Sequence, residues 1–221
     1  MPGLRLARLV LRRSLLSGAS PPFDVVLFDL GGVLVDFGGV EAMKELSGIT
    51  DDDELWHRWL TCRWVREFER GGCSPDEFAA GVVADWELAI TPAEYIESFA
   101  SWLGGPLPGA VELVAETKAV VTTGCLSNTN ALHWARSFSQ WAVIDALEHR
   151  FLSYELGAVK PDRDVFDRVA DRLDAPRDRI LFLDDNLVNV EGAREAGFRS
   201  ERAKGVDEAR AVLEAAGVLG S

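Results

Sequence analysis

The stretch FDLGGVLVD, at residues 28–36, sets the framework for the rest of the chain. The apolar run VVLF at residues 25–28 leads into it and is typical of a buried strand. That strand ends on Asp29, and the glycines Gly31 and Gly32 then favour a tight turn. A carboxylate at the carboxyl end of a buried parallel strand lies where open α/β sheets bind their ligands. Alone, such a segment is most often only a turn, so the case for a site depends on the later segments.

Three later segments carry polar side chains that match this first strand end: CLSNTN at residues 125–130, GAVKPD at 157–162 and LFLDDNLVNVEGA at 181–193. The first ends a strand on Ser127, and the second contains Lys160. The third ends a strand on the pair Asp184 and Asp185. Because the carboxyl ends of parallel strands meet at one edge of a sheet, these side chains are expected to form a single site.

The carboxylates of this set suit phosphoryl transfer. Asp29 can attack phosphorus and form an aspartyl-phosphate intermediate, which divides one difficult displacement into two. Since the carboxylate and the phosphate are both anions, a cation is needed between them. The pair Asp184 and Asp185 offers the hard oxygen ligands that suit Mg²⁺. Aspartate is also a favoured helix N-cap, and that role is compatible with metal binding.

The remaining polar residues of the set suit phosphate binding. Ser127 and Asn128 precede an expected helix at residues 129–137, where a hydroxyl and backbone N–H groups can bind an anion. Helix capping explains the same two residues equally well. Lys160 can place a compact positive charge on a phosphate oxygen, although a lone lysine is usually only a solvated surface residue.

The order of strand and helix patterns predicts an α/β fold with a doubly wound, Rossmann-like parallel sheet. Strand-like apolar runs occur at residues 25–28, 120–126 and 180–183, with a weaker one at 151–154. Between the last two runs, apolar residues recur at helical spacing from residue 165 to 173. Pro161 stands just before them and is expected in the first turn of that helix.

Residues 40–103 interrupt this alternation, because they carry no strand pattern. Capping boxes at residues 74–77 and 91–94 predict two helix starts, and the acidic run at 51–54 favours a third. The glycine- and proline-rich segment 104–109 is expected to return the chain to the sheet. The expected organisation is a core formed by residues 23–39 and 104–221, with an inserted helical cap at residues 40–103.

An aromatic stripe marks the expected cap. Trp56, Leu60, Trp64 and Phe68 recur at helical spacing, which predicts a packed interior. The alternative is that some of these rings line a sugar-binding surface.

Composition narrows the class of protein. The formal net charge of −13 over 221 residues argues against binding of nucleic acid or of an anionic membrane, and no apolar run is long enough to span a bilayer. The cysteines Cys62, Cys73 and Cys125 are widely spaced, which favours a reduced, cytoplasmic chain of unknown oligomeric state. The histidines His133 and His149 show no metal-ligand spacing and are expected to be structural or exposed.

Residues 1–22 differ from the rest of the chain in composition. Four arginines, several small residues and no acid occur here, which is typical of a transit peptide. We expect a disordered extension, or an upstream start codon in place of the true one, and the transit peptide is the alternative.

Taken in order, these motifs resemble the haloacid dehalogenase-like hydrolase superfamily, in the subgroup with a helical cap after the first strand. LSNTN, KPD and DDNLVNVEGA are most similar to the bacterial sugar phosphatases of the α-D-glucose-1-phosphate phosphatase type, over residues 23–200. The resemblance implies an Mg²⁺-dependent phosphatase that acts on a small phosphorylated metabolite, namely a sugar phosphate. It implies Asp29 as the nucleophile and Ser127, Asn128 and Lys160 as the phosphate ligands. The metal would be surrounded by Asp29, Asp184, Asp185 and the backbone carbonyl of Gly31. Asn189 would orient the acidic pair.

Gly31 departs from the usual phosphatase pattern, which has a second aspartate at this position. That aspartate protonates the leaving oxygen and then activates water, and loss of such a group typically costs about 10²- to 10⁴-fold in rate. Without it, we expect a preference for leaving oxygens that tolerate negative charge, such as the anomeric oxygen of a sugar 1-phosphate. The alternatives are a non-catalytic protein that binds a phosphometabolite or a partner, and a dehalogenase.

Overall fold

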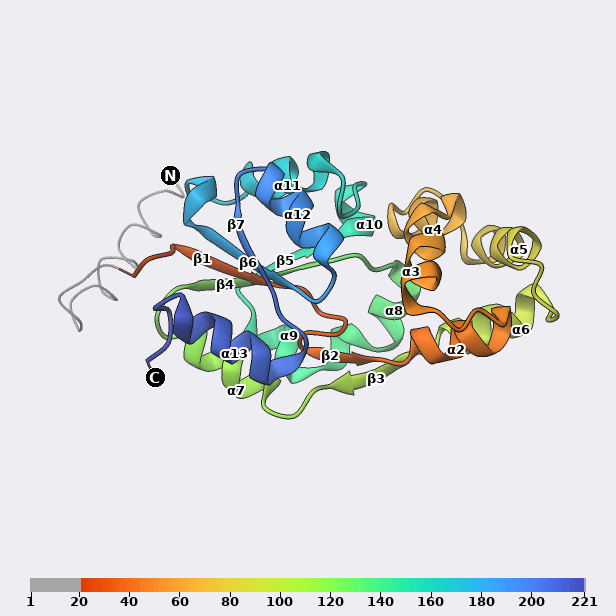
Figure 1. Cartoon of the computed structure of the whole chain (residues 1–221), viewed down its shortest axis with the longest axis horizontal. Coiled ribbons are helices and arrows are strands. Elements are labelled where there is room, and N and C mark those ends of the chain that lie inside the picture. The colour runs from red at the N-terminus through yellow and green to blue at the C-terminus, as the bar shows by residue number, and fades with distance from the viewer. Residues whose placement is uncertain (1–20, 221) are drawn as a thin grey trace.

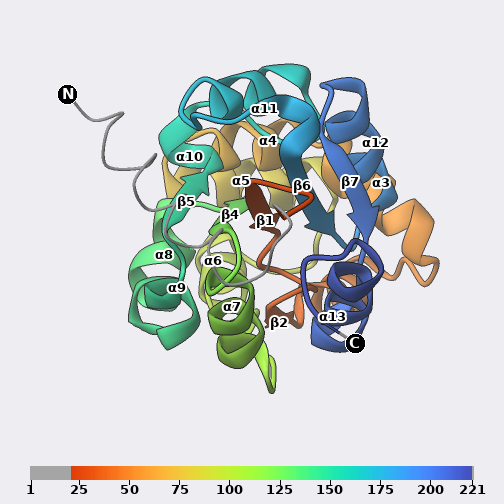
Figure 2. The same ribbon diagram turned by 90° about the vertical axis from the view of Figure 1, so that its left-hand side faces the viewer.

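Strand β1 (Val25–Phe28) lies at the centre of a five-stranded parallel sheet with the strand order β5-β4-β1-β6-β7 (Figures 1 and 2). The other strands are β4 (Thr122–Ser127), β5 (His149–Leu152), β6 (Ile180–Asp184) and β7 (Arg199–Arg202). The computed structural model describes residues 21–220, so nearly all of the expected N-terminal segment lies outside the described residues. The predicted doubly wound α/β fold is confirmed, and the weaker strand begins two residues earlier than expected.

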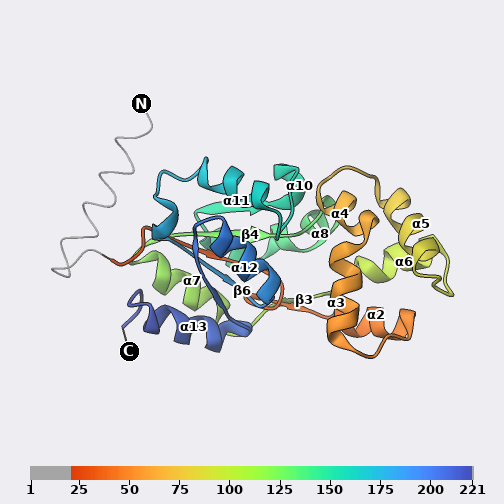
Figure 3. The same ribbon diagram turned by 45° about the horizontal axis from the view of Figure 1, so that its top comes forward.

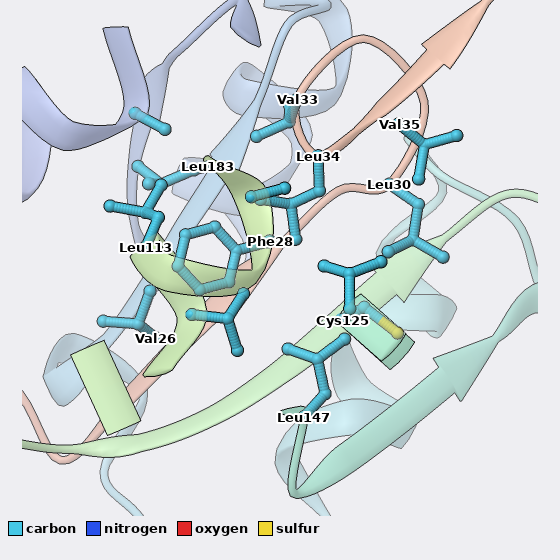
Figure 4. Packing of buried hydrophobic residues seen from close by; sticks show 14 of the residues in the cluster. Val26, Phe28, Leu30, Val33, Leu34, Val35, Leu113, Cys125, Leu147 and Leu183 are labelled. Atoms are coloured by element: carbon cyan, nitrogen blue, oxygen red, sulfur yellow. The ribbon is translucent and has the colours of Figure 1, made fainter. Parts of the chain in front are cut away.

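Helices cover both faces of this sheet, which is why β1 is apolar at every position. One face carries α7 (Ala110–Lys118), α9 (Ala142–Ala146) and α13 (Gly205–Ala215), and the other carries α10 (Ser153–Leu156), α11 (Arg163–Ala170) and α12 (Leu187–Glu195) (Figure 1). Val26 and Phe28 pack in the first layer with Leu113, as Figure 4 shows. Val25 and Leu27 point to the opposite face of the sheet, where they pack with residues of α11 and α12. The side-chain alternation of one strand therefore supplies both cores.

Five helices follow β1 before the chain returns to the sheet: α2 (Gly39–Ser47), α3 (Asp52–Thr61), α4 (Arg63–Glu69), α5 (Pro75–Asp85) and α6 (Pro92–Phe99). They gather beyond the carboxyl ends of the strands (Figures 1 and 3). The helix starts agree with their capping residues, since Ser74 and Thr91 form complete capping boxes and Asp51 accepts from the backbone N–H of Glu54.

The two crossings between this helical part and the sheet pair with each other. Strand β2 (Val35–Phe37) and strand β3 (Leu103–Pro106) form a small antiparallel sheet. Residues 104–106 of the segment that was expected to return the chain to the sheet are therefore part of a strand, and Leu103, the last residue of the stretch expected to be free of strands, belongs to it as well. Short strands rich in glycine and proline show no apolar alternation, so pairing partners far apart in sequence decide this structure.

The aromatic stripe is not continuous, which corrects the expected packing. Cys62 has an extended backbone (φ −64°, ψ 119°) and separates α3 from α4, so the helical phase is reset there. The buried positions of the two helices are Leu55, Trp59, Val65 and Phe68, whereas Trp56, Leu60 and Trp64 are only half-buried.

Two other helix starts are shifted. Helix α11 begins at Arg163 with Asp162 as its N-cap, so Pro161 precedes the helix and the expected first-turn position is wrong. Helix α8 (Ala131–Arg136) begins later than the expected residue 129, because the side chain of Asn130 caps it. Ser127 and Asn128 are therefore not its N-caps and remain available for other contacts.

Candidate active site

Asp29 stands directly after β1, where its backbone N–H donates to the carbonyl of Leu183 at 2.7 Å. Its side chain is almost entirely buried beside Asp184 and Asp185. Burial raises the pKa of Asp29 to about 7, Lys160 opposes the rise, and the two neighbouring carboxylates add to it. Because ionisation of Asp29 is unfavourable without a neighbouring cation, a bound cation would stabilise its carboxylate form.

Lys160 is the positive charge inside this acidic group. Its side chain is 1% exposed, and its Nζ lies 2.9 Å from Oδ1 of Asp29 and 2.6 Å from Oδ2 of Asp184. Burial alone disfavours the ammonium, but the two carboxylates outweigh it and hold the pKa of Lys160 above its usual value. The sequence-based alternative of a solvated lysine is therefore wrong.

The backbone around Lys160 is fixed by Asn128 across the sheet edge. The amide of Asn128 donates to the carbonyl of Lys160 at 3.1 Å and accepts from its backbone N–H at 2.9 Å. This side chain is occupied by the lysine loop, so only the backbone of Asn128 is left for a phosphate. Ser127 is buried at the end of β4, and its hydroxyl makes only a long contact of 3.5 Å with the carbonyl of Asn128.

The two aspartates after β6 have different surroundings. Asp184 is fully buried and accepts from Lys160, from the backbone N–H of Asn186 at 2.8 Å and from the amide of Asn189 at 3.1 Å. Asp185 is half-buried, and burial together with the charge of Asp184 raises the pKa of Asp185 to about 6. Asn186, rather than either aspartate, caps α12.

Oxygen atoms of Asp29, Asp184 and Asp185 lie within 4.8 Å of one another. The donor set is all carboxylate, which is the chemistry that Mg²⁺ prefers. The pKa values of Asp29 and Asp185 are raised first by burial and then by the neighbouring like charges, and a divalent cation would offset both effects. The residues present therefore fit this metal.

The two glycines after Asp29 differ in what surrounds them. A Cβ on Gly31 would have the Cβ of Phe37 as its nearest neighbour, at 3.9 Å. Gly32 has φ 75°, and a Cβ there would overlap the carboxylate of Asp185. Position 32 therefore requires glycine, whereas position 31 has room for a side chain.

We expect Gly31→Ala to fold and melt like the wild type, and Gly32→Ala to lose stability. Positive φ costs a side chain about 1–2 kcal/mol, and the displaced Asp185 should also weaken metal binding. Thermal unfolding of the two variants with and without Mg²⁺ measures both effects. Equal melting temperatures and equal Mg²⁺ stabilisation would contradict this account of position 32.

A cavity of about 530 Å³ opens above these residues. Asp29, Ser127 and Lys160 form its floor, and Trp56, Trp59, Glu69 and Phe99 of the helical part also line it. His133 lies at the same cavity, where it is buried, and its Nε2 donates to the carbonyl of Phe99 at 2.7 Å. Burial lowers the pKa of His133 to about 4, so the ring is neutral.

No sequence pattern indicated a role for Glu69, and the spacing of His133 indicated only a structural or exposed residue. Neither residue belongs to a recognisable spacing, and both reach the cavity only because α4 and α8 fold over the ends of the strands. All the residues that the motifs did indicate, except Asp184, line this one cavity. Asp184 lies directly beneath it, bonded to Lys160 and Asn189.

The aspartate after the first strand, the buried lysine and the acidic pair thus lie together at the carboxyl edge of a doubly wound sheet, where open α/β enzymes bind their ligands. The chain belongs to the haloacid dehalogenase-like hydrolases, since the model of that family matches residues 23–197. The resemblance inferred from the motifs is thereby confirmed at the level of the superfamily.

Individual relatives agree with this assignment. The chain is 30% identical over 190 residues to a D-ribitol-5-phosphate phosphatase of Bacteroides thetaiotaomicron, covering 79% of this chain and 89% of the relative. It is 27% identical over 185 residues to a phosphatase of Mycobacterium tuberculosis, covering 80% and 85%. A superfamily enzyme of B. thetaiotaomicron, solved with magnesium and inorganic phosphate, has the same fold, with a TM-score of 0.63, 23% identity and coverage of 82% and 94%.

The chain is therefore a phosphoric monoester hydrolase, and its three clustered carboxylates fit Mg²⁺ as the cofactor. None of the helices in the described part of the chain has the length and apolar character that a membrane span requires.

Proposed function

We propose that this phosphatase hydrolyses a phosphorylated sugar or polyol through an aspartyl-phosphate intermediate on Asp29. The observation that carries the proposal is the position of Lys160, whose Nζ contacts Asp29 and Asp184 at the floor of the cavity. A buried ammonium between two carboxylates holds the nucleophile in place and presents positive charge to an incoming phosphate.

The other floor residues divide into phosphate and metal ligands. The hydroxyl of Ser127, the ammonium of Lys160 and the backbone N–H of Asn128 bind the phosphate oxygens. Asp29, Asp185 and the carbonyl of Gly31 would hold Mg²⁺, which supplies charge neutralisation between nucleophile and phosphate. Asp184 and Asn189 support this arrangement, because both oxygens of Asp184 already accept hydrogen bonds.

The walls of the cavity support a polyhydroxylated substrate. Aromatic rings such as Trp56 suit the apolar face of a sugar, and polar groups such as Asp36 and Asp52 can bind hydroxyls. A relative that covers most of this chain is named for D-ribitol 5-phosphate, a phosphorylated polyol. The volume of about 530 Å³ leaves room for a substrate larger than phosphate itself.

A panel of sugar phosphates, polyol phosphates, nucleotides and p-nitrophenyl phosphate, assayed for phosphate release, tests the proposal. We expect the highest kcat/KM on a sugar or polyol phosphate, and loss of activity in EDTA that Mg²⁺ restores. Preference for nucleotides, or no turnover of any ester in Mg²⁺, would contradict the proposed substrate class.

A further inference from the structure

The cavity has a catalytic requirement that its floor does not meet. In phosphoryl transfer the attacking and leaving oxygens lie roughly in line with phosphorus. With Asp29 on the floor, the leaving oxygen therefore points towards the helical part of the protein. Gly31 offers no proton, so an acid for this oxygen has to come from the cavity wall.

Glu69 is the wall residue whose position suits that need. It is the last residue of α4, it is half-buried, and it lines the same cavity as Asp29, Ser127 and Lys160. Within residues 21–220, its carboxyl group has no hydrogen-bond or ion-pair partner. The other cavity carboxyls on this side are exposed, and Glu41 and Asp52 are both paired with Lys44.

The end of α4 that carries Glu69 is fastened to the core. Oδ2 of Asp162 accepts from Nη2 of Arg66 and from Nη2 of Arg70, each at 2.5 Å. The next residue, Gly71, packs so closely that a Cβ there would lie 2.8 Å from the carbonyl oxygen of Tyr154. Because Asp162 follows Lys160 by two residues, these contacts hold Glu69 over the phosphate-binding floor.

The surroundings of Glu69 favour its protonated form. Burial raises the pKa of Glu69 to about 8; Lys160 and Arg66 oppose the rise, and Asp29 adds to it. Asp185, Lys204 and the neutral His133 line the same cavity from the core side. At neutral pH the carboxyl therefore still carries the proton that a leaving oxygen needs.

We propose that Glu69 is the general acid–base residue of this phosphatase, in the role that an aspartate at position 31 would otherwise fill. This inference rests on the proposed function. As Asp29 forms its bond to phosphorus, the bond from phosphorus to the ester oxygen breaks and that oxygen takes the proton of Glu69. The Glu69 carboxylate then accepts a proton from water, whose oxygen attacks phosphorus while the bond to Asp29 breaks, and phosphate leaves.

Glu69→Gln tests this role, because glutamine keeps the shape but cannot exchange the proton. A sugar or polyol phosphate releases a poorly stabilised alkoxide, whereas p-nitrophenyl phosphate releases a stabilised phenolate that needs no acid. We expect kcat on the alkyl ester to fall about 10²- to 10⁴-fold, and the first step on the aryl ester to change little. On alkyl esters, the rate of the wild type should fall at high pH as Glu69 loses its proton. Glu69→Gln should not show this fall.

Glu45→Gln is the matched control, since Glu45 is exposed on α2 of the same helical part and forms no ion pair with Arg66 or Arg70. It should keep wild-type rates on both esters. The double variant Gly31→Asp, Glu69→Gln should hydrolyse alkyl esters at least tenfold faster than Glu69→Gln alone, because position 31 has room for the side chain.

The outcomes separate this inference from the proposed function. If the wild type turns over both esters and Glu69→Gln lowers both first-step rates equally, Glu69 only shapes the cavity and the inference is wrong. Wild-type rates on alkyl esters in Glu69→Gln would overturn it as well. If the wild type hydrolyses no ester in Mg²⁺, the proposed function itself fails and the inference fails with it.

Discussion

Asp29→Asn is expected to lower turnover of every phosphate ester by at least about 10⁴-fold, as loss of a catalytic nucleophile does in other hydrolases. Asparagine keeps the size of the side chain but cannot form the aspartyl-phosphate bond. Steady-state phosphate release measures the loss, and circular dichroism checks that the fold is retained. Retention of even a tenth of the activity would contradict an aspartyl-phosphate mechanism.

The same substitution should change how stability depends on pH. The pKa of Asp29 is raised from 3.8 to about 7 in the folded protein, so the folded state binds a proton more tightly than the unfolded state. In the metal-free wild type, this residue therefore makes stability fall as pH rises from about 4 to about 7. Asp29→Asn removes that contribution, and melting curves in EDTA across this range should be flatter for the variant.

Among the substitutions proposed as tests, Lys160→Met is expected to lower the free energy of unfolding most. Methionine fills a similar volume but leaves Asp29 and Asp184 without their shared ammonium, and breaking a buried ion pair from one side costs about 3–5 kcal/mol. Urea unfolding in EDTA measures the change, and phosphatase activity should be lost as well.

Lys118→Met is a suitable control for that measurement. Lys118 is on α7, and its Nζ donates a single hydrogen bond to the carbonyl of Ala146 at 2.9 Å, so its loss should cost about 1 kcal/mol. Equal losses for Lys118→Met and Lys160→Met would show that Lys160 does not hold a buried charge cluster together.

The sequence predicted the sheet and the floor of the site because both follow from strand ends. Apolar runs locate the strands, parallel pairing brings their carboxyl ends together, and Asp29, Ser127 and Asp184 therefore meet without further information. The helix starts at Ser74 and Thr91 were equally accessible, because a capping box is a local signal.

The wall of the cavity could not be predicted in this way. Glu69 reaches the site only through the docking of α4, which depends on the contacts of Arg66 and Arg70 with a residue more than ninety positions away. The break at Cys62 likewise changed which side of α3 and α4 is buried, and no single residue there signals a break. Local patterns carry no information about such packing.

Polar contacts between the helical part and the core, which we call fastenings, limit which caps this core can carry. Arg66 and Arg70 bind Asp162, close to Lys160, and the carbonyl of Phe99 accepts from His133, close to Ser127. A cap exchanged from another member of the family would bring a new specificity only if it also brought these fastenings. Recombination of caps and cores is therefore restricted by these contacts and by Glu69, while the other cap residues that face the substrate are free to vary.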